Sequence, residues 1–229
     1  MREIINFIVG KIKDKPFNLD KDIPLKYLII LIIDRFFMSI RGSLTLCKHG
    51  RFFFRDKRCV LKCKSKIKLG KSVSIARNCY IDALSKDGIT IGNHVSIGKN
   101  TTIECSGSML NIGKGLKVGD GVGMGTHGFF GCAGGIEIGE DTIFGNFVSM
   151  HSENHNYSDQ TVPIKLQGIN RKGIKVGANC WIGAKVTILD GAIIEDGCII
   201  AAGALVLEGV YPKNSIYGGV PAKFLKKRF

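Results

Sequence analysis

Two histidines, His151 and His155, lie four residues apart in a polar stretch of the sequence. This stretch interrupts an otherwise regular apolar pattern between Met150 and Val176. Histidine is the usual general base in enzymes because its pKa lies near neutral pH. A group transfer to a hydroxyl or an amine needs such a base to take the proton from the attacking atom. We therefore look for the chemistry of this chain here, with one of the two histidines as the base.

The pattern on either side of this stretch has a period of six. A large apolar residue recurs every six positions, and an apolar or small residue precedes it by two. The series reads Leu69, Ile75, Ile81; Ile91, Ile97, Ile103; Ile112, Val118, Met124; Ile138, Phe144, Met150; Val176, Ile182, Ile188, Ile194, Ile200 and Val206. Such a unit is typical of a short strand with one buried face, closed by a turn. Because one unit cannot bury its own face, the copies must stack into a solenoid.

Four spacings in the series are longer than six, and their positions follow a rule. They come after Ile81, Ile103, Met124 and Met150, which are every third unit. The repeat resembles that of the left-handed parallel β-helix acyltransferases, in which three units make one triangular coil. Insertions with a period of three would then all leave the same corner of that coil. Loops along one edge of a rigid scaffold are where binding groups are expected. We therefore expect about six coils, with the functional wall along this edge.

The units resemble the hexapeptide repeats of the left-handed parallel β-helix acyltransferases. The tail at residues 218–223, GGVPAK, is similar to the C-terminal signature of that family, in which a short helix follows the proline. The resemblance implies an all-β fold, a left-handed parallel β-helix over residues 67–229 with a short C-terminal helix. Residues 1–66 then form a basic and apolar N-terminal segment, partly helical and partly irregular.

The resemblance also ranks the two histidines. In the sugar O-acetyltransferase branch, a loop histidine is followed by an aspartate and then by Pro-Ile and Gln-Gly. The same order is found here in His155, Asp159, Pro163-Ile164 and Gln167-Gly168. His155 is therefore the expected catalytic base. Residues expected to bind the acceptor are Thr126, His127, His151 and Asp159.

A second block, CWIGA at residues 180–184, resembles the part of the family fold that lies beside acetyl-CoA. Its small residues would leave backbone groups open to the pantetheine arm, and basic residues of the tail match positions that meet the phosphates. Glu208 stands where relatives often have lysine, so the phosphates would depend on the tail. The expected cofactor-binding residues are Trp181, Gly183, Ala184, Ala202, Lys223 and Lys226. In the family this site lies between two subunits, which implies a homotrimer, and no metal is expected.

Basic residues are concentrated at the N-terminus. Residues 1–72 hold 18 Lys and Arg against six Asp and Glu, whereas residues 73–229 hold 15 against 13. Residues 23–40 are strongly apolar but carry Lys26, Asp34 and Arg35, so we expect a helix that does not span a membrane. It either caps the first coil or lies at the surface of an anionic membrane. We expect a cytoplasmic protein, in the second case at the inner face of the membrane.

Nucleic acid is not an expected partner, because the basic residues are not interleaved with aromatic residues as in recognised modules. The resemblance implies an acetyl-CoA-dependent O-acetyltransferase that acts on a sugar hydroxyl of a bacterial-type surface polysaccharide or its lipid-linked precursor. An N-acetyltransferase of a nucleotide-linked amino sugar remains an alternative. A metal hydratase of the γ-carbonic-anhydrase kind is another, and would draw three zinc ligands from His94, His127, His151 and His155. A non-catalytic β-helix scaffold is the last.

Overall fold

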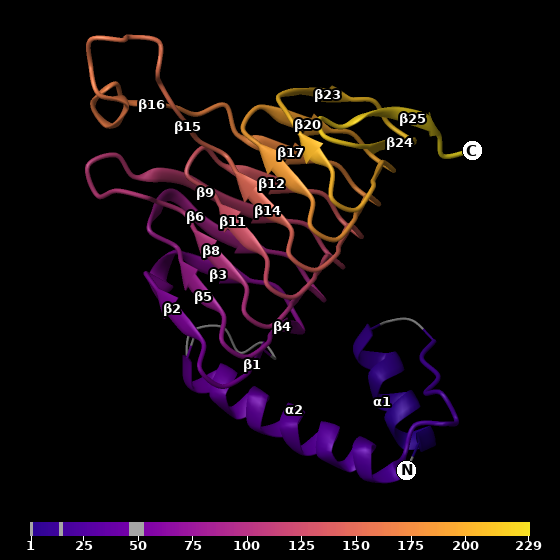
Figure 1. Cartoon of the computed structure of the whole chain (residues 1–229). Helices are drawn as coiled ribbons and strands as arrows, with labels where there is room; N and C mark the ends of the chain where they lie inside the picture. Colours follow the sequence, from indigo (N-terminus) through magenta and orange to yellow (C-terminus); the bar gives the residue numbers. More distant parts are fainter. Residues whose placement is uncertain (1, 14–15, 46–52) are drawn as a thin grey trace.

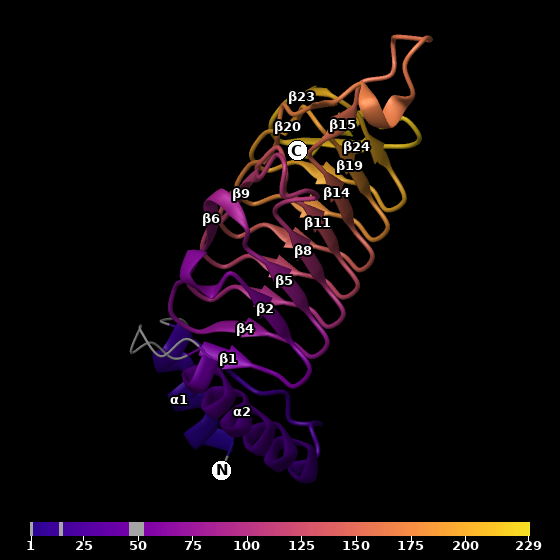
Figure 2. The ribbon, with the colours of Figure 1, turned by 90° about the vertical axis from the view of Figure 1, so that its left-hand side faces the viewer.

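The computed structural model describes residues 2–13, 16–45 and 53–229. Residues 53–229 form a parallel β-helix, and two α-helices lie at its N-terminal end (Figure 1). Each coil contributes one strand to each of three sheets, which we call faces A, B and C. Figure 2 shows the coils stacked one above another.

Face A comprises β1 (Phe53–Arg55), β4 (Val73–Ile75), β7 (Ser96–Ile97), β10 (Gly123–Met124), β13 (Ile143–Phe144), β18 (Trp181–Ile182), β21 (Ile199–Ile200), β24 (Ser215–Gly218) and β25 (Lys223–Lys227). Face B comprises β2 (Val60–Lys62), β5 (Tyr80–Asp82), β8 (Thr102–Glu104), β11 (Phe129–Gly131), β14 (Ser149–His151), β19 (Thr187–Leu189) and β22 (Leu205–Val206). Face C comprises β3 (Ile67–Leu69), β6 (Ser85–Ile91), β9 (Gly113–Val118), β12 (Ile136–Ile138), β17 (Ile174–Val176), β20 (Ala192–Ile194) and β23 (Gly209–Tyr211). Two short 3₁₀ helices lie outside these faces, at Lys64–Lys66 and Ile164–Leu166.

The strand register confirms the single corner but corrects the third insertion. Val118 pairs with Ile138 on face C, and Phe130 pairs with Met150 on face B. Phe130 is therefore a unit of the repeat that the predicted series left out, and Ile112 is not a unit. The insertions follow Ile81, Ile103, Phe130 and Met150, and all of them leave the corner between faces B and C.

The β-helix begins earlier than residue 67. Phe53 pairs with Val73 on face A, and Leu61 pairs with Ile81 on face B. These strands add a coil at the N-terminal end, so faces B and C each have seven strands in the described part of the chain. The expected count of about six coils is therefore one too low.

The tail is a strand where a short C-terminal helix was expected. The chain reverses at Gly219, whose φ is +98°, and β25 then pairs antiparallel with β24. Without β25 the outer edge of β24 would expose unpaired backbone groups. Pairing with this edge satisfies those groups, which explains why the tail is extended.

Helix α2 (Leu25–Thr45) lies across the first coil, and α1 (Arg2–Lys13) stands beside its far end (Figure 1). A Cβ on Gly42 would lie 1.9 Å from the carbonyl oxygen of Phe53, so only glycine permits this close packing. Arg35 donates a hydrogen bond to Ser74 Oγ at 2.9 Å, and Arg41 Nη2 lies 3.6 Å from Asp56. Helix α2 thus covers the first coil, which is one of the two roles considered for this segment. Of the helices described, neither is long and apolar enough to cross a membrane.

Candidate active site

The two histidines lie in the longest insertion, between β14 and β17, which projects beyond the other loops of the B–C corner (Figure 1). His151 is the last residue of β14. His155 belongs to β15 (Asn154–His155), which pairs antiparallel with β16 (Ile169–Asn170). We call β15, β16 and the residues between them the ribbon. His155 is thus held by a strand pair, in a part of the chain with no hexapeptide pattern.

Buried polar side chains anchor both ends of the ribbon. Ser152 is 1 % exposed, and its hydroxyl donates to the Gly131 carbonyl at 2.7 Å. At the other end, Asp190 is also 1 % exposed and accepts hydrogen bonds from the backbone N–H groups of Lys172 and Gly173 at 2.7–3.0 Å. A buried carboxylate needs such donors. These bonds tie the ribbon to the coils on either side.

An ion pair between Glu153 and Arg171 closes the foot of the ribbon. Arg171 Nε lies 2.7 Å from Glu153 Oε2, and the two side chains are 17 % and 25 % exposed. The other guanidinium nitrogens donate to the side chain and backbone of Asn111 and to the Ile112 carbonyl. Arg171 therefore links the ribbon to the insertion between β8 and β9. Sequence reasoning missed this residue, because it lies outside every periodic unit.

The outer part of the ribbon is organised by Gln167. Its side-chain nitrogen donates to the Asp159 and Val162 carbonyls, and its oxygen accepts from the Asp159 backbone N–H at 3.0 Å. The carboxylate of Asp159 accepts hydrogen bonds from the hydroxyl and backbone N–H of Thr161, which lower the pKa of Asp159. Asp159, expected to bind the acceptor, has these loop contacts in the isolated chain.

His155 lines an open hollow of about 790 Å³ beside the ribbon. Its other polar lining includes Asn170, Gln167 and an ion pair in which Lys172 Nζ lies 2.6 Å from Glu208. The volume lies within the range of about 300–1,000 Å³ that is usual for small-molecule pockets. Glu208, the departure from the family pattern, is therefore part of the wall of this hollow.

His151 lies on face B, away from the hollow. Its ring packs against Phe129 with centroids 5.3 Å apart, and Nε2 lies 3.3 Å from Ser149 Oγ. Burial lowers the pKa of His151 and so favours its neutral imidazole. It stands above Gly131 and Glu104 on the same column of face B.

Thr126 and His127 lie at the corner between faces A and B. The His127 ring stacks on Phe147 with centroids 4.7 Å apart, and Nε2 lies 2.8 Å from the amide nitrogen of Asn100. The backbone N–H of Thr126 donates to Asn146 Oδ1 at 3.0 Å. Three expected cofactor residues continue this corner in later coils: Gly183, Ala184 and Ala202. A Cβ on Gly183 would lie 2.5 Å from the Ala202 nitrogen, so tight stacking already requires glycine there.

Trp181 lies on face A, with 54 % of its surface exposed as expected. It lines a hollow of about 200 Å³ together with Ile143, Ile199 and Arg228. Lys223 and Lys226 are on β25, at the outer edge of the same sheet. Arg228, which donates to the Gly197 carbonyl at 3.2 Å, was not predicted. Its position at the end of a basic tail was the only signal in the sequence.

Within one chain, the predicted residues other than His151 therefore form three groups. His155 and Asp159 are in the ribbon, Thr126 and His127 share a corner with the small residues, and Trp181 shares face A with the tail lysines. His151 lies on face B, between the ribbon and that corner. Among the described residues, no three His, Cys, Asp or Glu side chains are placed to hold a metal ion.

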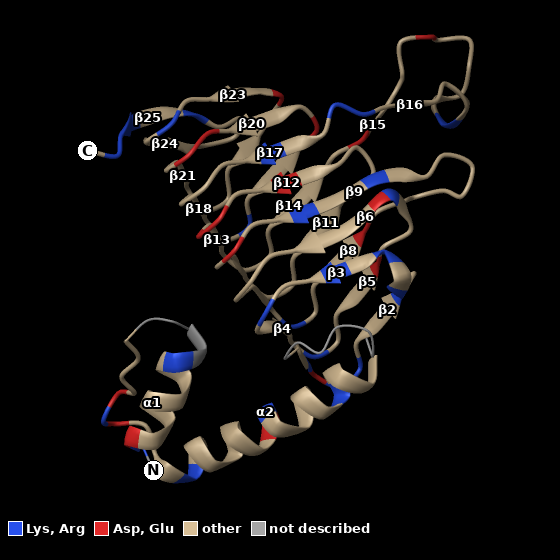
Figure 3. Cartoon of the chain, turned by 180° about the vertical axis from the view of Figure 1, so that it is seen from behind, with Lys and Arg blue, Asp and Glu red and all other residues tan. Residues whose placement is uncertain are grey.

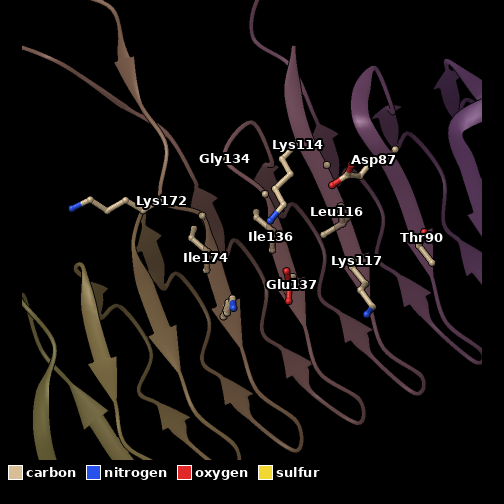
Figure 4. A pocket seen from close by; sticks show the side chains of 15 residues that line it. Asp87, Thr90, Lys114, Leu116, Lys117, Gly134, Ile136, Glu137, Lys172 and Ile174 are labelled. Atoms are coloured by element: carbon tan, nitrogen blue, oxygen red, sulfur yellow. The ribbon is translucent and has the colours of Figure 1, made fainter. Parts of the chain in front are cut away.

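Another hollow, of about 220 Å³, lies on face C (Figure 4). Figure 4 shows Lys114 and Lys117 on one strand and Glu137 on the next, beside Leu116 and Ile136. Lys172 borders both this hollow and the one beside the ribbon. No residue expected to act in catalysis or binding lies on face C.

Comparisons with known proteins agree with this architecture. Residues 173–208 match the family model described as bacterial transferase hexapeptide (six repeats). Over 160 residues the chain is 34 % identical to the probable acetyltransferase Rv3034c of Mycobacterium tuberculosis, an alignment that covers 70 % of this chain and 49 % of that protein. Residues 173–208 thus carry this hexapeptide repeat, and the chain is similar to acetyltransferases that contain it.

Two further proteins are similar to this chain. It is 28 % identical over 99 residues to the putative lipopolysaccharide biosynthesis O-acetyl transferase WbbJ of Escherichia coli, which covers 40 % of this chain and 50 % of that protein. The chain thus spans about half the length of both curated relatives. A crystal structure of a mutant of AntD, an N-acyltransferase from Bacillus cereus in complex with dTDP and coenzyme A, superposes with a TM-score of 0.57 at 22 % identity, over 70 % of this chain and 83 % of that one. The fold is a left-handed parallel β-helix.

Proposed function

We propose that this protein is an acetyl-CoA-dependent O-acetyltransferase that acts on a sugar hydroxyl. The observation that carries the proposal is the setting of His155, on a strand pair anchored at both ends, with its imidazole beside an open polar hollow. A general base must be held in position and yet be open to the substrate. Similarity to a protein described as a lipopolysaccharide O-acetyl transferase supports a sugar acceptor.

In the proposed reaction, His155 takes the proton from the acceptor hydroxyl as its oxygen attacks the thioester carbonyl of acetyl-CoA. The new C–O bond forms a tetrahedral intermediate, whose oxyanion is stabilised by backbone N–H groups. The C–S bond then breaks, and the imidazolium returns the proton to the departing sulfur. The products are the acetyl ester and free coenzyme A, and His155 is neutral again.

The acceptor is proposed to occupy the hollow beside the ribbon. Asn170 and Gln167 carry amide groups there, and the pair of Lys172 and Glu208 offers a donor and an acceptor for sugar hydroxyls. Since Lys172 also borders the hollow on face C, an acceptor longer than one sugar has room to continue along that face (Figure 4). This arrangement favours a surface polysaccharide or its lipid-linked precursor, modified in the cytoplasm.

Acetyl-CoA is proposed to bind along face A and the A–B corner. Trp181 offers an exposed ring there, and Lys223, Lys226 and Arg228 supply cations for the phosphates. In one chain this wall and His155 lie on different sides of the prism. The site is therefore proposed to form between two copies, in a homotrimer. Sedimentation of a monomer at assay concentrations would argue against this arrangement.

The proposal is tested by thiol release from acetyl-CoA with a panel of polysaccharides, lipid-linked oligosaccharides and nucleotide sugars. We expect release with a hydroxyl acceptor, and His155→Asn should lower kcat by about 10²–10⁴-fold because general-base help has that value. His151→Asn is the matched control, since it changes the neighbouring histidine, and it should be milder. Loss of turnover in His151→Asn but not in His155→Asn would show that the base is misassigned.

N-acetylation of a nucleotide-linked amino sugar is the second candidate. It is favoured by the likeness of the fold to an N-acyltransferase solved with dTDP and coenzyme A. The same panel separates the two, since an amino sugar with a free amine would then be acetylated in preference to every hydroxyl acceptor.

A further inference from the structure

One side of α2 faces the β-helix, and the opposite side is apolar and exposed. Arg35 marks the inner side, because it bonds Ser74 and lies 5.4 Å from the centroid of the Phe54 ring. Ile33 and Phe37 lie about 160° around the helix from Arg35, given 3.6 residues per turn. They are 48 % and 49 % exposed. The outward side thus presents large apolar side chains that the rest of the described chain leaves uncovered.

These residues belong to a stripe along the middle of the helix. Ile30, Ile33, Phe37 and Ile40 follow one another at spacings of three and four, and each is at least 41 % exposed. Ile29 and Phe36 widen the stripe on one flank, and both are exposed. An exposed apolar patch of this extent marks an interaction surface.

The first coil, on which α2 lies, carries exposed cations. Residues 53–72 contain one acidic residue, Asp56, and its carboxylate is already paired with Arg41 and Arg77. Figure 3 shows basic residues around β2, β3 and β4, next to α2. The exposed cations of this coil are Lys57, Arg58, Lys62, Lys64, Lys68 and Lys71. We call the stripe and these cations together the α2 surface.

The rim of the stripe distinguishes a bilayer from a second helix. In a two-helix seam with Ile30 and Ile33 at the a and d positions, charged residues normally occupy both e and g. Here e holds Asp34 and Arg41, whereas g holds the apolar residues Ile29 and Phe36, so the stripe is wider than such a seam on the g flank. A wide apolar face next to a surface rich in Lys and Arg is typical of a helix that lies in the surface of a membrane.

We propose that the α2 surface is a docking surface for an anionic lipid bilayer. The outward side of α2 enters the boundary between headgroups and acyl chains, and the first-coil cations lie over the anionic headgroups. Because α2 lies at one end of the stack (Figure 1), the coils of the β-helix would then extend away from the membrane. Four strand spacings separate β2 from β14 on face B, which places the start of the ribbon about 19 Å above the first coil. This height suits an acceptor that extends from the lipid, a consequence that rests on the proposed function.

The test is co-sedimentation of the full-length chain with vesicles of phosphatidylcholine alone or with 30–40 % phosphatidylglycerol, roughly the composition that raises a negative surface potential. We expect binding only to the anionic vesicles, and weaker binding in high salt because exposed charges are screened. Lys57→Gln with Arg58→Gln should weaken binding by about 30-fold, since each cation near the surface contributes about fivefold. Ile33→Ser with Phe37→Ser should weaken it by about tenfold or more.

Matched controls use exposed residues far from the α2 surface. Lys117→Gln with Lys175→Gln removes two cations from face C, and Met109→Ser with Leu110→Ser removes two exposed apolar residues from a loop. Both controls should bind like the unchanged chain. The proposal is overturned if the unchanged chain does not bind anionic vesicles. It is overturned likewise if the control variants lose as much binding as the variants of the α2 surface. It is also overturned if Ile33→Ser with Phe37→Ser reduces the oligomer mass but leaves vesicle binding intact, because the stripe would then bind a second copy. The assay needs no acetyl transfer, so its failure is distinct from a failure of the proposed function.

Discussion

Removing Arg171 should loosen the ribbon that carries His155. The Arg171→Met change keeps much of the apolar stem but deletes the guanidinium, which bonds Glu153, Asn111 and Ile112. A hydrogen bond to a charged group contributes about 1.5–3 kcal/mol when it is well shielded, whereas exposed ion pairs contribute about 0.2–1 kcal/mol. The pair of Arg171 and Glu153 is mostly shielded, at 17 % and 25 % exposure. We expect a cost of about 2 kcal/mol, which is about 30-fold in the opening equilibrium of the ribbon.

Hydrogen exchange read by mass spectrometry measures this opening. The backbone N–H of Asn156 bonds the Gly168 carbonyl at 3.1 Å, and that of Asp159 bonds Gln167 Oε1 at 3.0 Å. Both amides should exchange about 30-fold faster in Arg171→Met, since exchange follows local opening. The Ile174 amide, bonded to the Gly135 carbonyl at 2.9 Å on face C, should be unchanged. Acetyl transfer should fall in parallel, because a base on a mobile strand spends less time in position.

The ion pair between Lys172 and Glu208, just beyond the end of the ribbon, is the matched control. Lys172 and Glu208 are 2.6 Å apart but 47 % and 58 % exposed, so their attraction is screened by water. Lys172→Met should therefore speed exchange of the same amides by less than about threefold. If Arg171→Met has no larger effect than Lys172→Met, the inference that Arg171 holds the ribbon is refuted.

Three further changes test other parts of the structure. Gly42→Ala should destabilise the packing of α2 on the first coil by about 1–3 kcal/mol, because the new methyl would lie 1.9 Å from the Phe53 carbonyl oxygen. Limited proteolysis should therefore cleave α2 faster in this variant. Equal cleavage rates in Gly42→Ala and in the neighbouring Ser43→Ala would contradict this prediction. Lys223→Ala should weaken acetyl-CoA binding by about tenfold with little change in kcat, because a phosphate contact stabilises the ground state and the transition state alike. Calorimetry measures the affinity for acetyl-CoA, and steady-state kinetics measures kcat. A loss of kcat with unchanged affinity would argue against a contact between Lys223 and phosphate. Burial lowers the pKa of His151, so the unfolded state binds the proton of this histidine more readily than the folded state as pH falls through about 6.5. The thermal unfolding midpoint should therefore drop more between pH 7 and 5 in the unchanged chain than in His151→Asn. Parallel plots of the midpoint against pH would show that this histidine does not contribute.

Most of the fold could be predicted from the period of six. Alternation such as Val73 and Ile75, or Cys180 and Ile182, is local, and both members of each pair are buried as expected. The rule that insertions follow every third unit also predicted one corner, because a triangular coil returns to the same edge every three strands. The predicted register failed where local spacing is ambiguous. Ile112 precedes Val118 by six residues, as a true unit would, and only pairing with the next coil shows that Phe130 is the third strand.

The sequence alone also determined that the stretch after β14 carries a histidine suited to base chemistry, since residue type and order are local properties. Tertiary structure decided what holds that histidine. Glu153 and Arg171 are 18 positions apart in a stretch without periodicity, and their 2.7 Å contact exists because the ends of the ribbon meet at one corner. The edge of β24 likewise decided that the tail is a strand, since unpaired backbone groups favour pairing over the expected helix. Periodicity reports which side of a strand is buried, whereas contacts between coils depend on residues that are brought together only by folding.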